Sequence, residues 1–332
     1  MNRQVILAAA SQGIPQAHNF QIIERAVPDL ATDQILVENH FLSVEPAMRG
    51  WLSDKGNYSN PIRIGDVMRS IAVGRVTASK CEQYPVGTLV TGWFGWQELA
   101  VARPEDVIRV VKEVDLPMSL CLGVLGLNGM AAYLGLTLAG APIAGDTVVV
   151  STAAGAVGSI VGQVARLLGC RTVGIIGSEA KVRACLDVYG YDAALDYSHP
   201  QLAPKLAEAC PQGVNVYFDN TAGAISDAVR AQLAIGARIV VCGTASVASW
   251  DSPPTGPRVE RDLLTKRARM QGFLAFDHRD RYASTVETLA TWVRDGKLAW
   301  REDVLVGLEA CPDAIAGLYR GENMGKRVIR LR

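Results

Sequence analysis

A glycine-rich segment, Gly155-Ala156-Val157-Gly158, has the residue types and the place in the chain that binding of phosphate groups requires. It follows the apolar run 147–151, which has the pattern of a strand buried on both faces, and it precedes a helical pattern that extends to residue 169. Such a turn presents backbone N–H groups and the positive end of a helix dipole to a phosphate. We interpret Gly155 as permitting the tight turn and Gly158 as letting the backbone approach a pyrophosphate. The segment therefore predicts a dinucleotide site, rather than a turn that only packs a helix against a strand.

The end of the next expected strand, residues 172–176, indicates which dinucleotide binds. Sites specific for NAD usually place a carboxylate there, which accepts hydrogen bonds from the ribose hydroxyls. Here the small residues Gly177 and Ser178 follow, and Lys181 and Arg183 come soon after. A cation at this point suits the 2′-phosphate of NADP(H), although Glu179 is close and both cations could instead belong to a solvated helix face. The sequence therefore favours NADP(H).

Composition argues against several other classes of protein. The seven cysteines are scattered and none forms a CxxC pair, which is typical of a reduced, cytoplasmic protein rather than of a disulfide framework or a zinc site. Lysine plus arginine (33) equals aspartate plus glutamate (33), so neither nucleic acid nor a membrane surface is an expected partner. The N-terminus has no signal-peptide pattern, and glycines interrupt the longest apolar stretch, residues 116–144, which we interpret as a buried helix.

The candidate site residues lie in two parts of the chain with different patterns of expected secondary structure. The first third has short β-segments, such as 34–39, 71–76 and 88–92, separated by clusters of Gly, Pro, Asn and Asp, and it predicts a compact, barrel-like β domain. From about residue 145 strands and helices alternate, with strands expected at 214–219 and 237–243 and a helix at 225–235. This alternation predicts a doubly wound parallel sheet, and the last thirty or so residues again have a strand-and-turn pattern.

Several motifs together carry a family resemblance over nearly the whole length. They are residues 42–50 (LSVEPAMRG), 122–127 (LGVLGL), 131–133 (AAY), 153–158 (AAGAVG), 218–220 (FDN) with Gly223, Gly256-Pro257, and 323–326 (NMGK). With them the chain resembles the zinc-independent medium-chain dehydrogenase/reductases, in the branch of prostaglandin reductases, alkenal double-bond reductases and curcumin reductase. The resemblance implies a GroES-like β-barrel substrate domain at 1–125 and 300–332, and a Rossmann domain at 126–299, with NADP(H) in the cleft between them.

The resemblance also implies site residues. Cofactor contacts carried over by position are, for the pyrophosphate, Gly155, Ala156, Val157 and Gly158; for the 2′-phosphate, Lys181; for the adenosine side, Tyr197; for the nicotinamide ribose, Asn220, Cys242 and Gly243; for the nicotinamide, Phe273 and Leu274; and, reaching across from the C-terminal segment, Asn323. Cys242 is expected to be a small packing residue rather than a nucleophile. Relatives are often dimers assembled through the edge of the Rossmann sheet, so a homodimer is expected.

This chain departs from the family at the substrate side. Ala47 and Ala248 stand at positions where relatives commonly carry tyrosines that face the substrate, and Asn128 replaces a proline. The segment Thr221-Ala222-Gly223, in place of Val-Gly-Gly, is interpreted as a minor change. With both tyrosines absent, Tyr58 becomes the candidate hydrogen-bond donor in the pocket, unless it is only a packed loop aromatic. Trp51, Trp93 and Trp96 are candidate cavity walls, with ordinary domain packing as the alternative.

The chemistry implied is reduction of the carbon–carbon double bond of α,β-unsaturated aldehydes and ketones without a metal. Zinc relatives carry Gly-His-Glu where this chain has Gly65-Asp66-Val67, and neither His18 nor His40 has a cysteine partner at workable spacing. Hydride would pass from NADPH to the β-carbon, and the enolate oxygen would need a hydrogen-bond donor. An NADPH:quinone oxidoreductase and a non-enzymatic NADPH-binding sensor or scaffold remain the alternatives.

Overall fold

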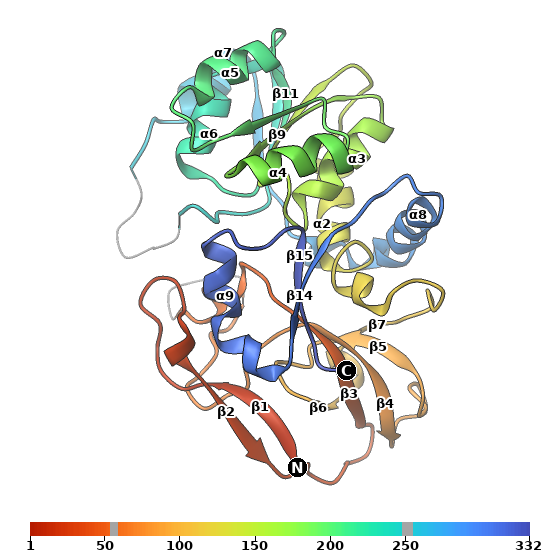
Figure 1. Cartoon of the computed structure of the whole chain (residues 1–332). Helices are drawn as coiled ribbons and strands as arrows, with labels where there is room; N and C mark the ends of the chain where they lie inside the picture. The colour runs from red at the N-terminus through yellow and green to blue at the C-terminus, as the bar shows by residue number, and fades with distance from the viewer. Residues whose placement is uncertain (54–58, 248–254) are drawn as a thin grey trace. The chain divides into compact units, whose positions relative to one another are not determined.

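The computed structural model describes residues 1–53, 59–247 and 255–332, and it divides into two compact units (Figure 1). Unit 1 contains residues 1–122 and 302–332, and unit 2 contains residues 123–301. None of the helices in the described residues is both long enough and apolar enough to cross a membrane.

Unit 1 is built on a seven-stranded sheet in the order β14-β15-β3-β4-β5-β7, with β6 paired to β3, beside a separate β1-β2 hairpin. All of its strand pairs are antiparallel except β14 with β15. The C-terminal strand β15 lies between β14 and β3, so the end of the chain completes the sheet in which β3 is the first strand in sequence order. Its strands are β1 (Asn2–Leu7), β2 (Phe20–Arg25), β3 (Ile35–Ser43), β4 (Ala72–Ser79), β5 (Leu89–Gly92), β6 (Leu99–Ala102), β7 (Val107–Val110), β14 (Glu302–Val306) and β15 (Lys326–Arg330).

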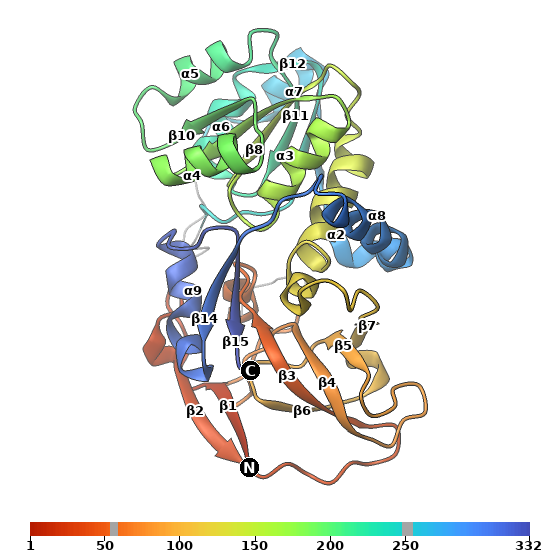
Figure 2. The ribbon, with the colours of Figure 1, turned by 45° about the vertical axis from the view of Figure 1, so that its right-hand side comes forward.

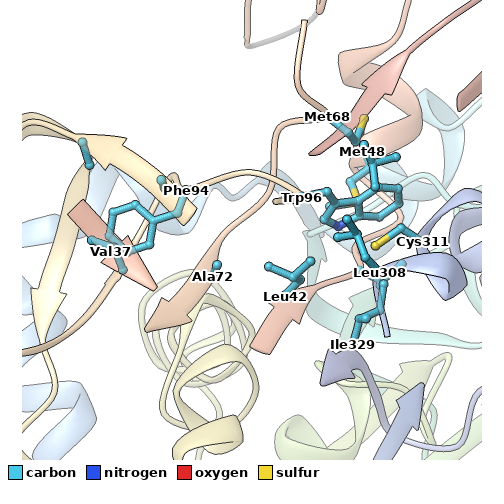
Figure 3. Close-up of a cluster of buried hydrophobic side chains, with 14 of the residues drawn as sticks. Val37, Leu42, Met48, Met68, Ala72, Phe94, Trp96, Leu308, Cys311 and Ile329 are labelled. Atoms are coloured by element: carbon cyan, nitrogen blue, oxygen red, sulfur yellow. The ribbon is translucent and has the colours of Figure 1, made fainter. Parts of the chain in front are cut away.

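Short helices close the ends of this sheet. They are α1 (Met48–Trp51), α9 (Cys311–Tyr319) and the 3-10 turns η1 (Ala17–Asn19), η2 (Pro104–Asp106), η3 (Met118–Leu122) and η7 (Leu308–Ala310). The core contains side chains from the first and last segments of the chain alike. Figure 3 shows the Trp96 ring, which is fully buried, near Met48, Met68 and Cys311. This arrangement means that unit 1 cannot bury its apolar surface without residues 302–332.

Unit 2 is a six-stranded parallel sheet in the order β10-β9-β8-β11-β12-β13 (Figure 2). In sequence order this is 3-2-1-4-5-6, the doubly wound arrangement whose strand order reverses between β8 and β11. The central strands are buried on both faces because helices cover them; for example, α3 packs on β8 and β9, and α7 packs on β12. The strands are β8 (Thr147–Ser151), β9 (Arg171–Ile176), β10 (Ala193–Asp196), β11 (Val214–Asp219), β12 (Leu233–Val241) and β13 (Arg269–Gly272).

The helices of unit 2 alternate with these strands. They are α2 (Leu127–Leu134), η4 (Gly135–Gly140), α3 (Gly158–Leu167), α4 (Glu179–Arg183), η5 (Ala184–Val188), α5 (Leu202–Ala209), α6 (Gly223–Arg230), α7 (Glu260–Lys266), η6 (Ala275–Arg281) and α8 (Tyr282–Arg294). The helix predicted at 225–235 was wrong at its end. It stops at Arg230, and residues 233–235 begin β12, where Gly236 with φ +76° bends the strand.

Candidate active site

The glycine-rich turn connects β8 to α3 as the sequence predicts. Gly155 N–H donates to the Thr152 carbonyl at 2.9 Å, and α3 begins at Gly158. A Cβ at Gly158 would lie 2.3 Å from the Thr152 carbonyl oxygen, so only glycine lets the helix start this close to the turn. The residue with positive φ is Thr152 (φ +55°), not Gly155. A threonine in the left-handed region is strained, so the surrounding structure must impose this conformation on the turn.

A buried tyrosine holds the first turn of this helix. The Tyr191 hydroxyl donates to the Gly158 carbonyl at 2.6 Å, and a Cβ at Gly162 would lie 2.1 Å from the Tyr191 ring. Burial raises the pKa of Tyr191 well above its usual value, so the phenol stays a neutral donor. The N-terminus of α3, whose N–H groups and dipole suit an anion, is therefore fixed from behind.

The end of β9 brings three of the expected residues together. Tyr197 N–H donates to the Ile176 carbonyl at 2.8 Å, and a Cβ at Gly177 would lie 2.6 Å from the Tyr197 hydroxyl, so glycine is needed under this half-exposed ring. Ser178 caps α4 by accepting from the Lys181 N–H at 3.4 Å. The result is an aromatic ring, a hydroxyl and an ammonium-bearing residue around one strand end.

The two other charges near this strand end interact with each other. The Arg183 guanidinium lies 3.6 Å from the Glu179 carboxylate, and both side chains are largely exposed. The Glu179 carboxylate would repel a 2′-phosphate bound at this strand end. Its pairing with Arg183 reduces that repulsion.

Asn220 lies where the strand order reverses. Its backbone N–H donates to the Ser151 hydroxyl at 2.8 Å, and its side-chain amide donates to the Ser151 carbonyl at 2.7 Å, so it bridges the carboxyl ends of β11 and β8. The N–H groups of Cys242 and Gly243, at the end of β12, both donate to the Asp219 carbonyl, at 2.8 and 3.1 Å. In open α/β sheets ligands bind outside the carboxyl ends of the strands at this reversal point.

The remaining expected residues of unit 2 are less exposed. Burial, with a smaller contribution from the Asp219 carboxylate, raises the pKa of the Cys242 thiol to about 12, which suits a packing residue and not a nucleophile. Phe273 donates its N–H to the Val241 carbonyl at 3.0 Å, and its buried ring stacks on His278 with centroids 5.1 Å apart. The ring of Phe273 is thus part of the packing, and Leu274 beside it is half-buried.

In unit 1, the segment after β3 carries Ala47 and is held by a buried ion pair. The Lys326 ammonium donates to the Ser43 hydroxyl at 2.7 Å, to the Val44 carbonyl at 2.9 Å and to the Glu45 carboxylate at 2.6 Å, with only 4% of its side chain exposed. Burial lowers the pKa of Lys326, and Glu45 opposes that shift. Ala47 itself is half-buried and packs against the core of this unit.

The aromatic candidates of unit 1 differ in exposure. Trp96 is fully buried and donates its indole N–H to the Ser43 carbonyl at 3.0 Å, which is the ordinary packing role that the sequence left open. Trp51 is also buried and meets half-buried Trp93 edge-on, with centroids 5.6 Å apart. Asn323 is half-buried and its amide donates to the Gly325 carbonyl at 2.9 Å. Tyr58 and Ala248 lie outside the described residues.

The structure gives roles to four residues for which the sequence predicted none: Thr152, Tyr191, Asp219 and Lys326, of which the last two belong to the motifs 218–220 and 323–326. Thr152 and Asp219 each neighbour a predicted residue, so a focus on strand ends could have found them. Tyr191 and Lys326 contact their partners from 33 and 281 residues away, and no local spacing signals them.

Among the described residues, the position where zinc relatives carry Gly-His-Glu is occupied by Gly65-Asp66-Val67. The Asp66 carboxylate accepts from the Arg63 N–H at 3.2 Å, and the described part of the chain contains no group of three or more His, Cys, Asp or Glu placed to hold a metal ion.

Comparisons with known proteins identify the family. A model described as the N-terminal domain of oxidoreductase matches residues 3–110, and one described as zinc-binding dehydrogenase matches residues 156–291. The NADPH-dependent curcumin reductase of Escherichia coli (strain K12) is 39% identical, over 99% of this chain and 97% of its own length. This chain belongs to the medium-chain dehydrogenase/reductase family.

Two further relatives of this medium-chain dehydrogenase/reductase indicate its branch of the family. The NADP(+)-dependent 2-alkenal reductase of Nicotiana tabacum is 36% identical, over 99% of this chain and 97% of its own. The structure of CurA in complex with NADPH from Vibrio vulnificus is 39% identical, with a TM-score of 0.93 and 99% of both chains covered. The predicted fold class, a GroES-like β-barrel domain with a Rossmann domain, and the predicted branch of the family are confirmed.

Proposed function

We propose that the chain is an NADPH-dependent reductase of the carbon–carbon double bond of α,β-unsaturated aldehydes and ketones. The observation that carries this proposal is its full-length identity, 39% and 36%, with two reductases whose names specify NADP(H) and a curcumin or 2-alkenal substrate. The NADPH-bound structural relative supports NADP(H) as the cofactor.

The residues of unit 2 fit this cofactor. The turn 155–158 and the N-terminus of α3 would hold the pyrophosphate, because Gly158 leaves no side chain in the way. Lys181 would hold the 2′-phosphate and Tyr197 would lie at the adenosine side, and Asn220 with Cys242 and Gly243 would lie beside the nicotinamide ribose. Phe273 and Leu274 would line the nicotinamide, the first mainly through its backbone. When bound, NADPH supplies the hydride that the reduction consumes.

The protein's own contribution is position and electrostatics. The carbonyl oxygen of the substrate gains negative charge as the double bond is reduced, and a preorganised hydrogen-bond donor stabilises that charge. Ala47 offers no hydroxyl, so we assign the role of hydrogen-bond donor to Tyr58. Asn323 would be a further cofactor contact, and Trp51 and Trp96 would support the wall of the substrate pocket. Lys326 fixes the segment that carries Ala47 through Glu45.

A panel of acceptors tests the proposed activity. NADPH oxidation should be fast with 2-alkenals, enones and dienones and slow with quinones, and Tyr58→Phe should lower kcat by about tenfold or more because it removes one donor to the developing charge. Faster turnover of quinones would support the quinone oxidoreductase alternative. Tight NADPH binding without turnover of any acceptor would support the non-enzymatic alternative.

We also propose that residues 1–125 with 300–332 form the substrate domain, that residues 126–299 form the cofactor domain, and that the protein is a cytoplasmic homodimer. All four residues of the edge strand β13 are exposed, and Leu264, in the helix before it, is 78% exposed. An unpaired edge with apolar neighbours suits pairing with a second copy. Light scattering should give twice the chain mass, and Met270→Pro should give the monomer, since proline cannot donate to a strand ladder.

A further inference from the structure

The loop after β11 adopts a backbone conformation that side chains strongly disfavour. Ala222 has φ +59° and ψ −160°, which lies at the border of a region populated almost only by glycine, and Gly223 follows with φ +63°. The expectation that Ala222 is a minor change was therefore wrong. An alanine persists in this conformation only where its surroundings impose it, so we asked what holds residues 220–223 in place.

The carboxylate of Asp219 holds the loop from inside the sheet. Its Oδ1 atom accepts from the N–H groups of Thr221 and Ala222, at 2.9 and 2.8 Å, and from the Tyr217 hydroxyl at 3.0 Å. The Thr221 and Ser151 hydroxyls lie further away, at 3.3 and 3.4 Å. Asp219 is 1% exposed, so these bonds form away from water, where a charged acceptor is strong.

The segment after β12 holds the opposite side of the loop. Ser246 N–H donates to the Thr221 carbonyl at 2.9 Å, and its hydroxyl contacts the Thr221 and Ala222 carbonyls at 2.6 and 3.0 Å. A Cβ at Gly223 would lie 2.7 Å from that hydroxyl, so a side chain there would displace Ser246. The loop is thus fixed through the N–H groups on one side and the carbonyls on the other.

Asn220 lies inside this arrangement, between Asp219 and the strained residue. We propose that Asp219 and Ser246 are positioning residues for cofactor binding, which hold residues 220–223 in a strained conformation so that Asn220 stays at the point where the strand order reverses. The proposal rests on the NADP(H) site of the proposed function. If Asp219 or Ser246 is replaced, the strain at Ala222 should drive the loop away from the conformation that binds the cofactor.

This consequence can be measured as coupling between two substitutions. Asp219→Asn keeps the shape but loses the charge, and we expect it to raise the Kd for NADPH about tenfold, because charge-assisted hydrogen bonds are roughly twice as strong as neutral ones. A glycine at position 222 has no strain to relieve, so the loop has no reason to relax. In the Ala222→Gly background, Asp219→Asn should therefore raise the Kd by only about twofold to threefold.

A second left-handed alanine supplies the matched control. Ala141 has φ +42° and lies at the end of η4, so Ala141→Gly also relieves strain and should raise the Tm by roughly 2–4 °C, as should Ala222→Gly. Of these two substitutions, only Ala222→Gly should reduce the effect of Asp219→Asn on NADPH binding. An equal change of Kd in the wild-type, Ala222→Gly and Ala141→Gly backgrounds would overturn the proposal, as would a fall in Tm on Ala222→Gly.

Ser246→Ala tests the same coupling from the other side and does not depend on whether Asp219→Asn folds. It should weaken NADPH binding severalfold in the wild-type background and much less in the Ala222→Gly background, and equal weakening in both counts against the proposal. NADH binding should change in parallel with NADPH binding, because the loop is on the nicotinamide side. The Kd values are measured without any acceptor, so an enzyme inactive on the whole substrate panel would still answer the question. Failure of the proposed activity and failure of this inference are thereby separate results.

Discussion

Replacing Lys326 by methionine should destabilise unit 1 strongly. The substitution keeps most of the volume of a side chain that is 4% exposed and removes an ammonium with three hydrogen bonds to Ser43, Val44 and Glu45. The Glu45 carboxylate, itself 10% exposed at the side chain, would then keep the Ser43 hydroxyl, 2.7 Å away, and lose its cation.

The expected magnitude follows from the loss of this cation beside the buried Glu45 carboxylate. Removing one partner of a buried ion pair costs about 3–5 kcal/mol. For a unit of this size, each kcal/mol lowers the Tm by about 2–4 °C, so the expected fall is roughly 6–20 °C. The double variant Lys326→Met, Glu45→Gln lacks both charges of this pair, and it should recover more than half of the lost free energy of unfolding, because neutral replacements of buried pairs are often well tolerated.

Urea unfolding followed by tryptophan fluorescence is the assay. The Trp96 indole donates to the carbonyl of Ser43, the residue whose hydroxyl Lys326 contacts, so its emission reports on this cluster. Lys297→Met is the matched control: Lys297 pairs with Asp295 at 2.8 Å, but its side chain is 52% exposed, and the expected loss is below about 1 kcal/mol. The reasoning is refuted if Lys326→Met costs no more than this control, or if the double variant is less stable than Lys326→Met.

Three further outcomes are expected. Glu302→Gln should raise the free energy of unfolding at pH 7 and make it depend less on pH. Burial raises the pKa of Glu302 above 4.5, so the folded state binds more protons than the unfolded state, and stability falls as the pH rises through the pKa of the folded state. Denaturant titrations from pH 4 to 7 would contradict this if the stability profiles of the wild type and the variant coincide. Lys181→Ala should raise the Kd for NADPH about 10- to 100-fold and leave that for NADH nearly unchanged, and equal weakening would exclude a 2′-phosphate role. Tyr191→Phe removes the 2.6 Å hydrogen bond to Gly158 and should lower the Tm by roughly 2–6 °C in thermal unfolding, whereas an unchanged Tm would mean that this bond does not fix α3.

The sequence predicts best those elements whose pattern is local and strong. The strand 214–219 has the predicted bounds, because a run of apolar residues ending at Asp219 and Asn220 admits few alternatives. The end of the helix that follows this strand was harder to predict. The apolar residues 233–235 continue a helical pattern equally well, and only Gly236, with its positive φ, shows that they belong to the bent strand β12.

The candidate site shows the same division. The turn 155–158 was placed correctly between β8 and α3, but the sequence could not reveal that Thr152 takes the left-handed conformation in place of a glycine. The strain at Ala222 was missed for a similar reason: an alanine in a loop gives no sign of its φ, and here Ala222 donates a hydrogen bond to Asp219 and accepts one from Ser246. Dihedral angles imposed by distant contacts are invisible to residue type and spacing.

The insertion of unit 2 between residues 122 and 302 has a consequence for synthesis of the protein. Domains generally fold as units while the chain emerges from the ribosome, so the parallel sheet of residues 123–301 can form while the first unit still lacks its last strands. Until β15 emerges, β3 lacks one of its partner strands in the finished sheet, and Glu45 lacks Lys326. A nascent chain that stalls or is cut before residue 326 would thus retain a folded nucleotide-binding half beside an open, aggregation-prone sheet. The barrel domain can therefore fold completely only after the whole polypeptide has been synthesised.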